Sequence, residues 1–221
     1  MATPTRNSDP KRIARTSRTF ISLALFTCCL SISALAQQYS CQPQRFLSKD
    51  FDHQVSVWSP DQSRRIQFRR NRKVRVESGG ITIGELGLPD DPVNTAIKWA
   101  PDSRSFYVEV SGNAIGGQLI AYTVVGHTLL KLHGPEAVAR EFAEKHSCKS
   151  RGNNLHAVRW EDGSQRLLLM PEVYPTSDCG EEMGYSEGFL VDAESGKIVK
   201  QYSQAVIEAE RKKCWPDVPS R

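Results

Sequence analysis

Three copies of one pattern constrain the fold of this 221-residue chain more than any other feature. In each copy a short apolar stretch ends in tryptophan, passes through a polar turn and resumes as a second apolar stretch. The copies are residues 55–61 (VSVWSPD), 96–102 (AIKWAPD) and 157–163 (AVRWEDG). Proline and aspartate are typical of such turns because proline presets φ and aspartate bonds the backbone ahead of it. We therefore predict repeated β-hairpins, with Trp58, Trp99 and Trp160 at equivalent positions in a core between sheets.

The spacing of the tryptophans indicates the length of one unit. Trp58 and Trp99 lie 41 residues apart, the length of one propeller blade, whereas Trp99 and Trp160 lie 61 apart. The additional residues include an apolar pattern of helical spacing that begins near a proline. We predict three four-stranded antiparallel units in residues 55–203, with a helical insertion at about 134–148. An N-terminal segment (37–54) precedes them, and a C-terminal helix and tail (204–221) follow.

The WSPD and WAPD turns, each followed by an aliphatic or aromatic strand, resemble the repeats of TolB-like β-propeller proteins. The resemblance covers roughly residues 55–202. The third copy departs from it at 161–163, and Gln62 and Ser103 stand where the family has glycine. The resemblance implies an all-β, partial or open propeller and a non-catalytic binding role in the bacterial envelope.

Three blades are too few to close a propeller, which needs about four to eight. The open edges of a secreted protein have to be covered. The inserted helix, the C-terminal helix and the N-terminal segment are candidates for that cover. The alternative is a homodimer in which two chains pair into a six-bladed ring.

The N-terminus has the pattern of a secretory signal peptide. Residues 1–18 contain five basic residues and one acidic residue, and the apolar stretch that starts at Thr19 ends in Ala-Leu-Ala36. We predict cleavage after Ala36 and a periplasmic or secreted protein. The alternative is a retained membrane anchor, because the apolar stretch is about as long as a short membrane-spanning helix of about 17 residues. No second such segment follows.

Removal of residues 1–36 leaves 24 basic and 24 acidic residues, so the mature chain is formally neutral. This balance gives no support to nucleic-acid binding. Four cysteines remain after cleavage: Cys41, Cys148, Cys179 and Cys214. An even number in an exported protein predicts two structural disulfides. Three connectivities are open, of which we favour Cys41 with Cys148 and Cys179 with Cys214.

The sequence contains no motif for a cofactor, a nucleotide or a metal ion. The five histidines are irregularly spaced, the glycine-rich residues 112–117 lack the lysine of a phosphate loop, and no Gly-x-Ser-x-Gly occurs. We therefore expect neither cofactor nor enzymatic activity. The alternative is a hydrolase with an unmarked site between repeats. A pocket holding His133 or His156 beside a carboxylate, with coupled pKa values, would favour it.

Seven basic residues crowd into the twelve positions of the first hairpin: Arg64, Arg65, Arg69, Arg70, Arg72, Lys73 and Arg75. Arginine binds carboxylate and phosphate through two parallel hydrogen bonds, so this hairpin is a candidate site for an anionic partner. Export favours an envelope protein or an anionic glycan over nucleic acid. The alternative is a solvated hairpin whose charges protect an exposed sheet edge from aggregation.

Overall fold

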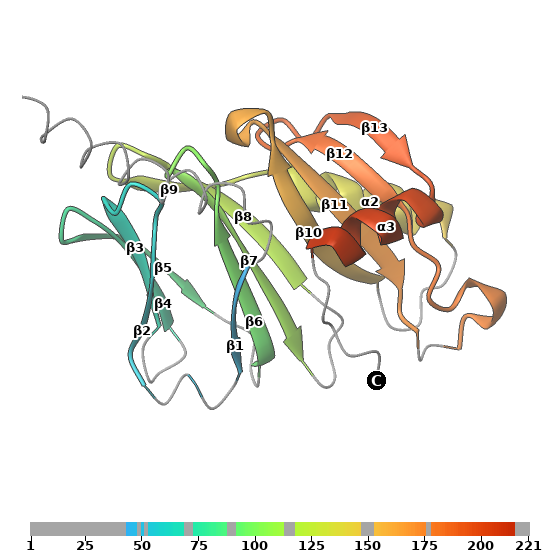
Figure 1. Ribbon diagram of the computed structural model, residues 1–221, viewed down its shortest axis with the longest axis horizontal. Helices are drawn as coiled ribbons and strands as arrows, with labels where there is room; N and C mark the ends of the chain where they lie inside the picture. Colours follow the sequence, from blue (N-terminus) through green and yellow to red (C-terminus); the bar gives the residue numbers. More distant parts are fainter. Residues whose placement is uncertain are drawn as a thin grey trace, which may run out of the picture. The chain divides into compact units, whose positions relative to one another are not determined.

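The computed structural model describes residues 43–47, 50, 53–68, 73–87, 92–112, 118–146, 153–175 and 178–214. The chain divides between Gln37 and Gln38, and every described residue belongs to the second unit. The predicted signal peptide lies outside the described residues. These residues form three antiparallel sheets and two α-helices (Figure 1). The prediction of an all-β, propeller-like chain with open sheets is confirmed.

Each sheet follows the order of the chain. The first consists of β2 (Val55–Trp58), β3 (Arg64–Phe68), β4 (Lys73–Ser78) and β5 (Ile81–Gly87). The second consists of β6 (Pro92–Trp99), β7 (Ser105–Gly112), β8 (Gln118–Val125) and β9 (Thr128–Lys131), with β1 (Gln44–Leu47) added beside β6. The third consists of β10 (Asn153–Glu161), β11 (Arg166–Val173), β12 (Gly188–Asp192) and β13 (Ile198–Tyr202).

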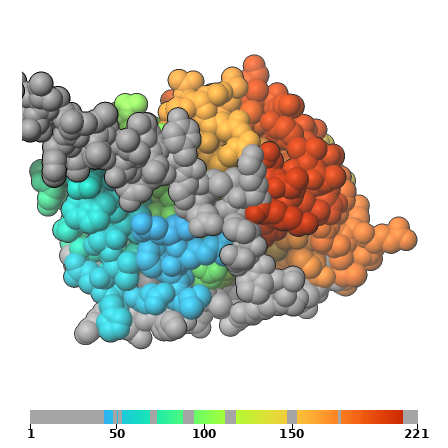
Figure 2. Space-filling model, viewed as in Figure 1, coloured from blue at the N-terminus to red at the C-terminus, as the bar shows by residue number. Residues whose placement is uncertain are grey.

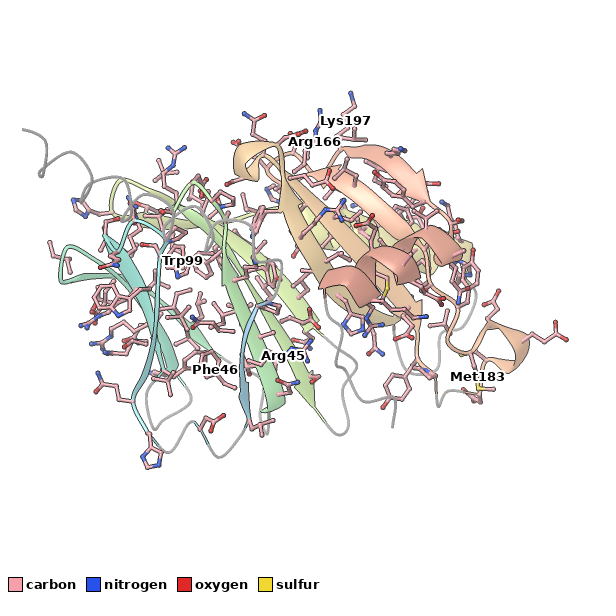
Figure 3. All side chains as sticks on the ribbon, in the orientation of Figure 1. Arg45, Phe46, Trp99, Arg166, Met183 and Lys197 are labelled. Carbon is pink, nitrogen blue, oxygen red and sulfur yellow. The ribbon has the colours of Figure 1, made fainter. Side chains whose placement is uncertain are left out.

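Strand alternation produces the core between the first and second sheets. In β3, Ile66 and Phe68 are fully buried and point toward the second sheet. They share one apolar cluster with Trp99, which lies between the two sheets (Figure 3). The indole Nε1 of Trp99 also donates a hydrogen bond to the carbonyl oxygen of Val57, at 3.1 Å. The repeat tryptophan of the second unit therefore joins it to the first.

The core between the second and third sheets includes the inserted helix. Tyr107 of β7 and Trp160 of β10 lie with their ring centroids 6.2 Å apart. Helix α2 (Gly134–Lys145) adds Val138 and Phe142, both fully buried in the same cluster. The helix begins near Pro135, as the sequence predicts, because proline is tolerated in a first helical turn.

The other face of the third sheet is covered by helix α3 (Gln204–Cys214) (Figure 2, red). Its Ile207 is fully buried against Val158, Leu168, Met170 and Leu190. Only glycine fits at position 188, because an added Cβ would lie 2.8 Å from the Cδ1 of Ile207. The C-terminal helix was expected to protect an open edge; it covers a sheet face instead.

The short helices η2 (Asp162–Ser164) and η3 (Gly180–Glu182) lie in connections of the third sheet. The N-terminal segment contributes β1, which pairs antiparallel with β6 from Gln44 opposite Ile97 to Leu47 opposite Asn94. Phe46 of this strand packs against Phe68 of the first sheet, with ring centroids 5.1 Å apart. Part of the predicted N-terminal cover therefore lies along one edge of the second sheet.

Candidate functional site

The outer face of the first sheet, the face turned away from the second sheet, is formed mostly by polar side chains. By strand register and alternation it is formed by Ser56, Trp58, Arg65, Gln67, Lys73, Arg75, Glu77 and Glu85. Trp58 is its one large apolar side chain. The faces buried between sheets are lined by aliphatic and aromatic residues instead.

Trp58, Arg65 and Glu77 form an ordered row across this face. The guanidinium carbon of Arg65 lies 5.4 Å from the ring centroid of Trp58. Arg65 donates from Nε and Nη2 to Oε2 of Glu77, both at 2.7 Å, and the Glu77 side chain is only 9% exposed. An exposed cation–π contact contributes about 0.5–1 kcal/mol. More important here, the ion pair fixes the position of the guanidinium against the indole.

A second group of charges lies two strand positions away. Arg75 donates from Nη2 to Oε1 of Glu85 at 2.7 Å, and Lys73 Nζ lies 3.8 Å from Oε2 of the same carboxylate. Two cations thus share one carboxylate. Among the described residues of the outer face, three cations stand against two carboxylates.

The predicted basic cluster is divided by the sheet. Arg65, Lys73 and Arg75 lie on the outer face, whereas Arg64 alternates to the opposite side. There Arg64 donates to Ser63 Oγ at 3.0 Å and to the carbonyl oxygen of Ser103 at 3.2 Å. It therefore belongs to the contact between the first two sheets. The remaining members of the cluster, residues 69, 70 and 72, lie outside the described residues.

The three repeat tryptophans do not share one environment. Trp99 is 6% exposed and Trp160 8%, but Trp58 is 51% exposed. The prediction of a core position is therefore wrong for Trp58. The reason is positional: Trp99 packs against the first sheet and Trp160 against the second, each on the unit that precedes its own. Trp58 belongs to the first unit, and no described sheet precedes it.

The turns after the tryptophans connect successive sheets. The Asp61 backbone N–H donates to Ser103 Oγ, and the Asp102 backbone N–H donates to Ser164 Oγ, both at 3.0 Å. Each acceptor stands four residues after its tryptophan, with φ of 58° and 88°. Gln62 occupies the equivalent position of the first unit with φ of 60°. All three adopt the left-handed conformation for which the TolB-like motif has glycine.

The carboxylate of Asp61 shapes the first of these turns. Burial would raise its pKa, but hydrogen bonds from Ser59 and Ser63 and the charge of Arg64 lower it overall. Asp61 is consequently ionised at neutral pH and accepts bonds on both oxygens. Asp61 therefore has a structural role, because its carboxylate holds the turn by local hydrogen bonds.

A second cluster of ionisable groups lies between the second and third sheets. His156 Nδ1 of β10 lies 2.7 Å from Glu109 Oε1 of β7, and Nε2 lies 3.7 Å from Glu172 Oε2 of β11. The other oxygen of Glu109 accepts from the Ala157 backbone N–H at 3.2 Å. The His156 and Glu109 side chains are 13% and 10% exposed. The cluster therefore connects β7 of the second sheet to β10 and β11 of the third.

Burial alone would lower the pKa of His156, and the charge of Arg211 also lowers it. The carboxylates of Glu109 and Glu172 outweigh both and raise this pKa to about 9. Burial alone would raise the pKa of Glu172, but His156, Arg211 and Asn154 lower it overall. At neutral pH His156 is thus an imidazolium held between carboxylates. Sequence analysis named His156 but missed both carboxylates. The available signal was a glutamate inside the apolar stretch of β7 (SFYVEVSG).

The remaining predicted residues are placed only in part. Cys179 packs against the core of the third sheet at the start of η3. Cys214 ends helix α3, and Cys41 and Cys148 lie outside the described residues. The disulfide pairing stays a prediction.

Within the described ranges, no group of three His, Cys, Asp or Glu side chains is arranged to hold a metal ion. Neither helix described here reaches the length and apolar character required to cross a membrane. No protein-family model matches the chain, and no curated protein matches it. The TolB-like resemblance therefore depends on the turn motifs and stays a prediction.

Proposed function

We propose that the mature protein is an exported, non-catalytic binding protein of the bacterial envelope, which recognises a protein or anionic partner through the outer face of its first sheet. The observation that carries this proposal is the ordered polar surface around the exposed Trp58. Clustered, exposed aromatic and arginine side chains are the groups that most often dominate binding interfaces.

The distribution of charge supports an anionic partner. Between Arg64 and Glu85 the sequence has seven basic residues and two acidic ones, although the mature chain as a whole is neutral. Such a local imbalance attracts an oppositely charged partner and accelerates its association. Export is supported by the basic and apolar pattern of residues 1–36, and the even number of cysteines in the mature chain accords with an oxidising compartment.

The hydrolase alternative gains little from the His156 cluster. A general base has to be unprotonated at the operating pH and within reach of substrate. His156 is held as a cation by Glu109 and Glu172, and its side chain is mostly buried. Its contacts are those of a connection between sheets, so we favour binding.

The test is cross-linked capture of partners from an envelope extract by the tagged mature protein. We expect a reproducible partner whose capture weakens with salt and is lost in the triple variant Arg69→Ser/Arg70→Ser/Arg72→Ser. The matched control, Arg140→Ser/Lys197→Ser/Lys212→Ser, removes three exposed positive charges elsewhere and should retain the partner. Equal capture by both variants, or no partner for the wild type, would contradict the proposal.

A further inference from the structure

We infer that the partner is a glycan carrying carboxylate groups, and that Trp58 is the surface on which one of its sugar rings stacks. This inference rests on the proposed function, because it assigns a ligand class to the same outer face. It begins from the 51% exposure of Trp58, whose counterparts Trp99 and Trp160 are buried.

The indole of Trp58 is held in place without a covering sheet. Arg65 lies over the ring at 5.4 Å, and its two hydrogen bonds to Glu77 fix the guanidinium. A side chain that is already ordered loses little conformational entropy when a ligand binds. Trp58, a residue that is 51% exposed, is thus a preorganised aromatic side chain on this face.

Sugar rings match a surface of this kind. One side of a pyranose presents C–H groups, which pack on an aromatic ring, while its hydroxyls remain at the periphery for hydrogen bonding. Ser56 lies on the same face, two residues before Trp58 in β2. Among the described side chains of this face, the three cations Arg65, Lys73 and Arg75 stand against the two carboxylates of Glu77 and Glu85, which favours a carboxylated sugar.

A protein partner that covered the face with another β-sheet would be disfavoured. Inside the molecule, the second sheet covers the first with apolar side chains that include Phe106 and Val108. The third sheet covers the second with apolar side chains that include Leu167 and Leu169. A sheet laid on the outer face would bury the Arg65–Glu77 and Arg75–Glu85 pairs away from water, and this desolvation is costly. A hydrated glycan leaves those pairs in contact with water.

The experiment measures the retardation of the mature protein in affinity electrophoresis with polygalacturonate, alginate or hyaluronate. Dextran supplies neutral sugar, and polyglutamate supplies carboxylates without sugar. We expect retardation by at least one of the acidic polysaccharides and none by dextran. Trp58→Ala should weaken that binding at least tenfold, and Trp58→Tyr should restore part of it because the aromatic ring is retained.

The matched control is Ile81→Ala, which truncates another large exposed side chain of the first sheet and should leave binding unchanged. Binding should also blue-shift the tryptophan emission of the wild type and reduce its quenching by acrylamide, independently of any folding defect in a variant. Equal retardation of wild type and Trp58→Ala, or equally tight binding to polyglutamate, would show charge attraction alone and overturn the inference.

The two proposals fail in different ways. If no acidic polysaccharide retards the wild type but an envelope protein is captured and then lost in Trp58→Ala, the glycan inference is wrong and the binding function stands. If neither polysaccharide nor envelope partner binds, both are wrong. If the triple variant Arg69→Ser/Arg70→Ser/Arg72→Ser loses the envelope partner but still binds the glycan, the glycan inference stands, and the basic hairpin and the Trp58 surface are two different binding sites.

Discussion

The first and third sheets form the two ends of the array, and their outward faces differ in kind. The face of the third sheet is buried beneath α3, with Ile207 at the centre of an apolar cluster and Arg159 of β10 ion-paired with Glu210 of the helix. The face of the first sheet is polar, keeps Trp58 exposed and is ordered by ion pairs. A stack of repeats needs a terminal surface that water tolerates, and this chain obtains one by a helix at one end and by charge at the other.

The difference also bears on the binding function that we propose. Helix α3 covers the third face, whereas the outer face of the first sheet keeps Trp58 exposed and the ion-paired Arg65 and Glu85 partly exposed. The polar character of the first face also argues against the six-bladed ring, because a ring would place a sheet on Trp58 and another on the position of α3.

The largest expected effect distinguishes the exposed tryptophan from its buried counterpart. Trp99→Ala should lower the free energy of unfolding by about 3–5 kcal/mol, because it leaves a cavity between two sheets and removes the bond to Val57. Trp58→Ala should lower it by less than about 1 kcal/mol, since half of the side chain is already in water. Urea unfolding of both variants measures this. Equal losses would mean that Trp58 is covered in solution and would break the comparison.

The helix that covers the third sheet can be tested with two adjacent residues. Ile207→Ala should cost about 2–4 kcal/mol, because Ile207 fills the space above Gly188. Val206→Ala is the matched control: Val206 is 46% exposed, and its truncation should cost less than about 0.5 kcal/mol. A comparable effect of the two substitutions in thermal unfolding would contradict the packing of α3.

The ionised cluster between the second and third sheets predicts a pH dependence. The folded-state pKa of His156, about 9, lies above its ordinary value of 6.5. The stabilisation is therefore fully present below pH 6.5 and is lost as the pH rises through 9. The lowered pKa of Glu172 gives stabilisation that is present above its ordinary value of 4.5 and lost as the pH falls.

In His156→Gln the stability difference from the wild type should be on the order of 2 kcal/mol at pH 6.5 and should shrink toward pH 9.5. Denaturant unfolding of both proteins at several pH values gives this difference directly. A difference that stays constant across that range would show that His156 is not held as a cation.

The smallest expected effects concern two turns, the one after Trp58 in the end unit and the one after Trp99 in the inner unit. Gln62→Gly should raise stability by about 0.5–1 kcal/mol, because glycine adopts its positive φ without strain. The same change at Ser103 relieves the same strain but deletes the acceptor for the Asp61 N–H, a loss of about 1 kcal/mol. We expect no gain there. A gain of equal size at both positions would mean that the serine does not connect the sheets.

The sheets and both helices could be predicted from sequence because their signals are local. The turn after each tryptophan and the apolar spacing around Phe142 lie within a few residues of the structure that they specify. The environment of Trp58 is not local information: equivalent tryptophans differ in burial according to whether they pack on a preceding sheet among the described residues.

The contacts that sequence reasoning missed lie between distant segments. Glu109 and His156 are 47 residues apart and meet only because β7 and β10 face each other across two sheets. The division of the basic cluster was predictable in principle, since alternation alone sends Arg64 and Arg65 to opposite faces. Strand β1 has only four residues and no strong pattern, so its pairing depends on the edge that β6 offers.

The pairing of β1 with β6 has a consequence for how the molecule opens. Since both strands belong to the second sheet, the whole first sheet is an excursion of the chain that starts and ends on that sheet. The first two sheets should therefore unfold as one cooperative block, and amide protons of β2–β5 should exchange together with those of β1 and β6. The surface around Trp58 would then keep its geometry for as long as that block remains closed.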